Sequence, residues 1–197
     1  VAYYAVLCLY PEWGGDFQMY CAGIARLYRN LSNPAHEAMS VPGDQSTFYT
    51  PYLVAIALLG KILDVTPFRA LQAAGVFNVV LFAFGVCFLF SRVSIHRRWW
   101  LAAACFIFTT LCLRWFHWGW SSETSLTNFQ YIQPYPSTFA WALAFIAFGL
   151  LDTLWKRWRW VDASILSVTV SALLMSHALT GTWVAGIVGL PQRVTAP

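Results

Sequence analysis

The sequence predicts an all-α protein, a polytopic integral membrane helix bundle with amphipathic helices beside the membrane. Hydrophobic residues make up 59% of the 197 positions and charged residues only 10%, whereas a soluble domain carries about 25% charged residues. The eleven tryptophans, nine tyrosines and fifteen phenylalanines suit the aromatic belts of a membrane–water interface. The net charge of +4 is modest and sits in short basic runs. Nucleic-acid binding is therefore not expected.

One transmembrane domain is expected over residues 1–197. Its first apolar run is cut short, which indicates a fragment of a longer polypeptide. Residues 11–64 would form an outer-face loop with interfacial helices, and residues 69–190 would supply the membrane helices. The five cysteines form no CxxC pair. They therefore indicate neither a disulfide framework nor a zinc site.

The first third of the chain is expected to lie mostly outside the bilayer. Val1–Tyr10 is too short to span, since crossing takes about 20 apolar residues, and would be the exit end of a helix. Phe17–Leu31 has apolar residues three and four positions apart, which predicts an amphipathic helix in the interface plane. Arg26 and Arg29 would then face lipid headgroups. Pro51–Leu63 is short and apolar, and we favour a helix that does not cross the membrane over one that does.

Later apolar runs predict three membrane spans, at Ala70–Phe90, Trp99–Leu113 and Pro136–Leu154. A further run, Ile165–Ser176, is interrupted at His177–Thr180. Basic residues follow the first and third spans: Arg92, His96, Arg97 and Arg98 in one loop, and Lys156, Arg157 and Arg159 in the other. The positive-inside rule makes both loops cytoplasmic. The loop at 115–133 and the residues before Ala70 would then share the opposite face.

The most informative motif is WGGDFQMY, which ends at Tyr20 and carries one of the few acids of the chain, Asp16. An ionisable residue beside a membrane is costly unless it has a task. About thirty residues later comes STFYTPY, followed by the helix-forming run that contains Ala70–Phe90. Over about residues 10 to 100 this order resembles the polytopic glycosyltransferases of the GT-C fold, which take sugar from a polyprenyl-phosphate carrier. The positions that match the family's motifs are Asp16, Phe17 and Tyr20; Tyr49, Thr50, Pro51 and Leu53; and Arg69, Leu71 and Asn78.

The resemblance implies transfer of a sugar from a polyprenyl-phosphate donor to an acceptor on the non-cytoplasmic face. It also implies a multi-pass protein of the cell (inner) membrane, surrounded by membrane lipids. Such a transfer needs a base for the acceptor hydroxyl and positive charge near the leaving phosphate. The family's loop aspartate serves as base or metal ligand, which points to Asp16 and to a divalent cation, Mg²⁺ or Mn²⁺. The alternative role of Asp16 is that of a helix N-cap.

Other residues are weaker candidates for substrate binding. The matched positions Tyr20 and Tyr49 are two of them. Arg69 and Arg114 could each grip a lipid phosphate, although such arginines commonly extend to headgroups instead. Glu123 could supply a second carboxylate or belong to a capping box. His177 interrupts an apolar run, where histidine is often functional, but a packing role or a helix end explains it equally well.

The rival hypothesis is a non-catalytic transmembrane accessory subunit of a larger membrane complex, built on a GT-C-like scaffold. Fold alone does not decide between the two. A transporter is a third reading, and the scarcity of intramembrane charges speaks against it. The motifs of nucleotide-binding loops and of serine hydrolases are missing from the sequence.

Overall fold

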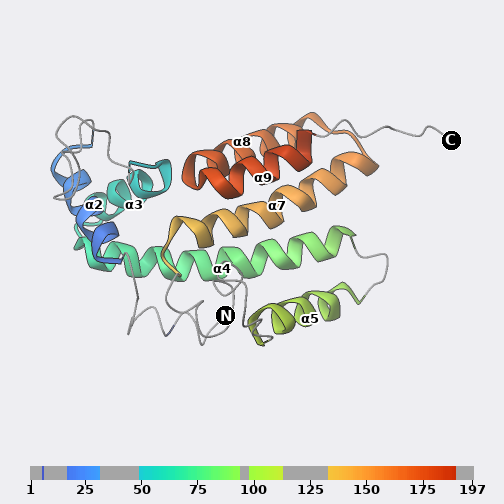
Figure 1. Ribbon diagram of the computed structural model, residues 1–197, viewed down its shortest axis with the longest axis horizontal. Helices are drawn as coiled ribbons and strands as arrows, with labels where there is room; N and C mark the ends of the chain where they lie inside the picture. Colours follow the sequence, from blue (N-terminus) through green and yellow to red (C-terminus); the bar gives the residue numbers. More distant parts are fainter. Residues whose placement is uncertain (1–5, 7–16, 32–48, 94–97, 113–132, 190–197) are drawn as a thin grey trace.

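The computed structural model describes residues 6, 17–31, 49–93, 98–112 and 133–189, and the regular structure among them is entirely helical. This confirms the all-α prediction for that part of the chain. Figure 1 shows α4 and α7 side by side, α5 beyond α4, and a hairpin of α8 and α9 along α7. The short helices α2 and α3 gather at the end where α4 and α7 begin. The helices are α2 (Phe17–Arg29), α3 (Pro51–Ile62), α4 (Pro67–Val93), α5 (Trp99–Cys112), α7 (Pro136–Lys156), α8 (Trp160–Ser176) and α9 (Ala178–Gly189).

Two of the described helices, α4 with 27 residues and α7 with 21, are long and apolar enough to cross a membrane. Large apolar side chains on α4 are open to the surroundings, with Phe77 and Phe84 each 55% exposed. Such exposure suits a helix that faces lipid better than the buried core helix of a soluble protein. By contrast, α5 has only 14 residues, which corresponds to a length of about 21 Å. The helix predicted at Trp99–Leu113 is therefore present, and its crossing of the membrane stays a prediction.

The central contact of the bundle joins α4 to α7 through small residues. A Cβ atom added at Gly85 would lie 2.7 Å from the backbone oxygen of Ala142 and 3.3 Å from Cβ of Phe145. On α7, Ala142 and Ala144 are almost completely buried. Small residues let two helix backbones approach closely, which is how helices associate in lipid, where hydrophobic burial supplies little driving force.

Replacing Gly85 by leucine should therefore force α4 and α7 apart. We expect a loss of about 1–3 kcal/mol of stability, the usual cost of overpacking, because a backbone oxygen cannot move aside as a side chain can. Thermal unfolding of the detergent-solubilised protein, followed by circular dichroism, measures this loss. Gly186→Leu is the matched control, since a Cβ there meets nothing within 4 Å. Equal melting temperatures for the two variants would contradict the proposed close approach.

The predicted apolar stripe of α2 is present, but it packs against protein. Ile24 and Leu27 are buried at 0% and 2% exposure, in one cluster with residues of α3 and α4. The expectation that this stripe faces the membrane interface therefore needs correcting, because α3 and α4 cover it. Tyr28 donates a hydrogen bond to the backbone oxygen of Val65 at 3.0 Å, and Lys61 donates one to the backbone oxygen of Tyr28 at 3.0 Å.

Both ends of α3 are defined by local chemistry. At its start, Thr50 accepts a hydrogen bond from the amide of Leu53, and proline follows at the first helical position. At its end, Asp64 adopts a positive φ of 51°, and the amide of Val65 donates to the oxygen of Gly60 at 3.0 Å. This is a Schellman turn, in which aspartate takes the place usual for glycine. The chain therefore reverses sharply from α3 into α4.

Candidate functional site

A cavity of about 560 Å³ lies between α3, the first turns of α4, the start of α7 and the end of α8. Only two of its lining residues, Tyr52 and Ser176, carry a polar side-chain atom. A wall with so few hydrogen-bonding groups suits a hydrocarbon chain far better than a free sugar or a nucleotide. The lining residues are Pro51, Tyr52, Ala55, Ile56, Leu59, Gly60, Leu63, Val65, Ala70, Ala73, Ala74, Phe77, Phe139, Ala172 and Ser176.

A buried polar cluster adjoins this cavity through Tyr52. The side-chain amide of Asn78, on α4, is fully buried and donates to the Tyr52 hydroxyl at 2.7 Å and to the backbone oxygen of Gln133 at 2.9 Å. Tyr52 in turn donates to the backbone oxygen of Pro134 at 2.8 Å. The cluster thus ties α3 and α4 to the segment that leads into α7. Interhelical hydrogen bonds of this kind hold helices together in membranes.

Aromatic contacts extend the cluster toward α2. The ring of Tyr52 stacks on Phe139 with 4.8 Å between centroids. The ring of Tyr20, one of the predicted substrate residues, lies 4.7 Å from that of Tyr135. The first turns of α2 are therefore held beside the start of α7. Tyr20 thus contacts Tyr135, whose backbone oxygen accepts from Asn78 at 3.4 Å.

Tyr49 and Arg69 are both exposed and lie outside the cavity wall. The Tyr49 hydroxyl donates to the backbone oxygen of Leu31 at 3.0 Å, a contact that fastens the start of α3 to the end of α2. Arg69 donates to the side-chain oxygen of Gln72, on its own helix, at 2.9 Å. Its next neighbour, Ala70, does line the cavity. Arg69 is thus a cation at the edge of the cavity, in contact with its own helix.

His177 lies at the break between α8 and α9. Its ring nitrogen Nδ1 is 2.8 Å from the Thr180 hydroxyl and accepts from the Thr180 amide at 3.4 Å. The histidine therefore acts as the N-cap of α9, and the interruption of the apolar run predicted at this position is confirmed. Because Ser176 lines the cavity, this turn closes one side of it. A helix end, which the sequence analysis gave as one alternative role for His177, therefore explains these contacts.

Three predicted site residues, Asp16, Arg114 and Glu123, lie outside the described residues, as do most of Val1–Tyr10 and the loop at 115–133 up to residue 132. Asp16 is joined directly to Phe17, the first residue of α2. Among the residues that the structure describes, no group of three or more His, Cys, Asp or Glu side chains could hold a metal ion. The metal-ligand role of Asp16 stays a prediction.

Two ionisable groups on α2 have altered acidity. Burial raises the pKa of the Cys21 thiol and that of the Tyr28 hydroxyl, because desolvation disfavours the charged form of each. Both groups are therefore neutral at physiological pH. Cys21 is a free thiol that packs against the α2–α3–α4 cluster. Neither group is activated as a nucleophile.

The sequence analysis did not predict Tyr52, Asn78 and Gln133 as site residues, although Asn78 is one of the positions that match the motifs of GT-C glycosyltransferases. Asn78 had a usable signal, since it is a polar residue inside the apolar run Ala70–Phe90. Tyr52 and Gln133 had none, because they border apolar runs in which aromatic and amide residues are common. Their association rests on contacts between positions 26 to 82 residues apart. Helical periodicity carries no information at that separation.

Comparison with known proteins adds no relative to this picture. No protein family, curated protein or solved structure matches the chain. The resemblance to GT-C glycosyltransferases therefore stays a prediction.

Proposed function

We propose that the protein is a multi-pass membrane glycosyltransferase that moves a sugar from a polyprenyl-phosphate donor to an acceptor on the non-cytoplasmic face. The observation that carries this proposal is the apolar cavity of about 560 Å³ beside helices long enough to span a membrane. A lipid-linked donor needs such a space for its prenyl chain. A sugar donor activated by a soluble nucleotide would instead need polar groups around it.

The position of the cavity supports the same function. It lies where α3 meets the beginning of α4, at the end of the bundle that the positive-inside rule assigns to the non-cytoplasmic side. With the prenyl chain in the cavity, the phosphate would lie toward that end, where Arg69 is an exposed cation. We assign Arg69 or Arg114 to the leaving phosphate, since a guanidinium can bind it through two hydrogen bonds.

Asp16 is the proposed general base for the acceptor hydroxyl. It directly precedes α2, whose Tyr20 contacts Tyr135 at the start of α7. A carboxylate in hydrogen-bonding reach of the hydroxyl would take its proton as the bond to the sugar forms. A divalent cation at Asp16 would instead stabilise the phosphate.

Asp16→Asn in the full-length protein should lower transfer by about 10²- to 10⁴-fold, the usual contribution of a positioned base. The assay is loss of label from a panel of polyprenyl-phosphate hexoses in membranes that contain the protein. Thermal stability should stay near that of the wild type. Asp64→Asn is the matched control, because Asp64 lies at the same end and asparagine tolerates its positive φ of 51°. Undiminished turnover by Asp16→Asn would refute the catalytic assignment.

The alternative is a non-catalytic accessory subunit, and one observation favours it. Tyr49, Arg69 and His177 each make a local structural contact, and these contacts do not converge on one point. A subunit of this kind should have its cavity collapsed or filled by a neighbouring chain. In the enzyme, the cavity between α3, α4, α7 and α8 would instead stay open to the lipid. Co-purification as a stoichiometric member of a larger complex, without transfer activity, would decide for the subunit.

A further inference from the structure

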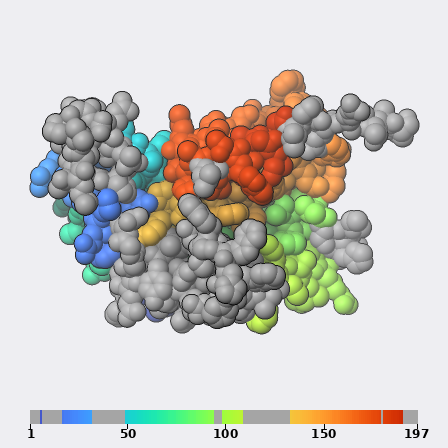
Figure 2. All heavy atoms as spheres, in the orientation of Figure 1, coloured from blue at the N-terminus to red at the C-terminus, as the bar shows by residue number. Residues whose placement is uncertain are grey.

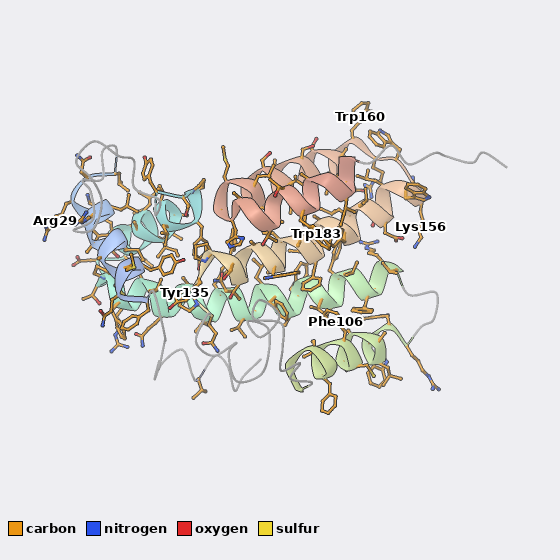
Figure 3. The ribbon with its side chains drawn as sticks, viewed as in Figure 1. Arg29, Phe106, Tyr135, Lys156, Trp160 and Trp183 are labelled. Carbon is orange, nitrogen blue, oxygen red and sulfur yellow. The ribbon has the colours of Figure 1, made fainter. Side chains whose placement is uncertain are left out.

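The end of the bundle opposite α2 carries a surface of cations and indole rings. Figure 3 shows Lys156 and Trp160 at this end and Arg29 at the other. The Lys156 ammonium group donates to the backbone oxygen of Arg92 at 2.8 Å, which fastens the end of α7 to the end of α4. We call this region the basic-tryptophan surface. It consists of Arg92, Trp155, Lys156, Arg157, Trp158, Arg159 and Trp160.

The charges on this surface do not cancel among the described residues. Lys156 pairs with Asp152 at 2.7 Å, and the Arg159 side chain is 3.9 Å from Asp162. Arg92 and Arg157 pair with no carboxylate in the described ranges. The Arg92 guanidinium lies 5.1 Å from the centre of the Phe88 ring, which leaves its charge uncompensated. The surface therefore presents net positive charge to its surroundings.

The indole rings of the same surface are unusually open. Trp158 and Trp160 are 63% and 77% exposed, and their rings meet edge to face at 5.6 Å. An indole ring is most stable at the headgroup level of a membrane. There its apolar body contacts the lipid chains while its N–H group stays hydrated. Exposed apolar side chains continue from here along the helices, including Val93 on α4 and Val161 on α8. The surface thus forms the border between an apolar belt and a basic end.

We infer that the basic-tryptophan surface binds the headgroups of anionic phospholipids, with Arg92 and Arg157 receiving the phosphate charge. This combination of cations and indoles at the margin of an apolar belt favours a lipid over an acidic protein segment, which would leave the adjoining apolar side chains uncovered. The inference rests on the membrane setting of the proposed function. It does not depend on sugar transfer or on Asp16.

Quenching of tryptophan fluorescence by brominated lipids tests this inference. The full-length protein is reconstituted in phosphatidylcholine vesicles that contain either brominated phosphatidylglycerol or brominated phosphatidylcholine. Tryptophans away from the surface contribute equally with both lipids. We expect half-maximal quenching at a roughly 25-fold lower content of the anionic lipid, because each of the two unpaired cations near an anionic surface enriches the anionic lipid by about fivefold. High salt should reduce the difference.

The double variant Arg92→Gln with Arg157→Gln should lose most of the preference for the anionic lipid. Arg26→Gln with Arg29→Gln, on α2 at the other end, is the matched control and should keep the preference. Arg157→Lys, which retains the charge, should also keep it. Equal quenching in the wild-type protein, an unchanged preference in the double variant, or competition by inorganic phosphate at constant ionic strength would each overturn the inference. Failure of the protein to enter vesicles would overturn the membrane setting itself, and with it the proposed function.

Discussion

Ala172→Phe is expected to lower binding of a polyprenyl-phosphate donor by at least about tenfold while leaving the fold intact. Ala172 lines the cavity from the end of α8, so a phenyl ring at this position would occupy the space that the prenyl chain needs. To bind, the prenyl chain would have to push this ring aside, which costs about 1–3 kcal/mol, the usual cost of overpacking. Labelling by a photoreactive polyprenyl phosphate, measured on the full-length protein in vesicles, reports the binding.

The neighbouring substitution Ser171→Phe provides the control. Ser171 is exposed on the same helix and is not part of the cavity wall. The Ser171→Phe variant should therefore be labelled as strongly as the wild type. Ala73→Phe, which lines the same cavity from α4, should reproduce the loss. Because these rings fill existing space, melting temperatures should stay equal to or above that of the wild type. Full labelling of both cavity variants would mean that the lipid binds elsewhere.

Asn78→Leu should destabilise the bundle by about 1–3 kcal/mol, the cost of leaving buried polar groups without partners. Leucine has the same branched skeleton of heavy atoms as asparagine and is somewhat larger, so the substitution leaves no empty space and removes the hydrogen bonds. The backbone oxygen of Gln133 would lose its donor at 2.9 Å, and Tyr52 would lose the bond that it accepts at 2.7 Å. Thermal unfolding in detergent, followed by circular dichroism, measures the change.

A double-mutant cycle with Tyr52→Phe separates the polar contact from general packing. Tyr52→Phe alone should cost less, because Asn78 keeps the Gln133 oxygen as acceptor. The two changes should be clearly non-additive, since the residues touch. Additive losses, or an Asn78→Leu variant as stable as the wild type, would show that the cluster does not hold α3 and α4 to the start of α7. The Asn78 oxygen Oδ1, which has no partner among the described residues, already makes the cluster incomplete.

The helices were largely predictable because the signals that produce them are local. The apolar stripe of Phe17–Leu31 reappears as α2, and the run Pro136–Leu154 reappears as α7, two residues longer at its end. The helix predicted at Ala70–Phe90 begins three residues earlier, at Pro67, since the Thr66 hydroxyl accepts from the amide of Arg69. Proline at the first helical position and a hydroxyl cap are readable from sequence.

The direction in which each helical face points was much less predictable. A stripe of apolar residues packs equally well against lipid and against another apolar helix. The spacing of apolar residues in α2 therefore could not show that α3 and α4 cover its apolar stripe. The same holds for α7, which contacts α4 on one side and α8 and α9 on another; Figure 2 shows the atoms of α8 and α9 packed along α7. The candidate site was affected most, because Tyr49 fastens α3 to α2 and His177 caps α9.

By itself, the sequence determined the composition of the chain, the positions of its helices and the basic residues at their ends. These properties depend on neighbours within a few positions, through helical spacing, capping and the hydropathy of continuous runs. Only the tertiary structure decided where the cavity lies, that Asn78 and Tyr52 meet, and that Gly85 lets α4 approach α7. The physical reason is that packing between helices depends on shape and hydrogen bonding between residues far apart in the chain, which no local pattern encodes.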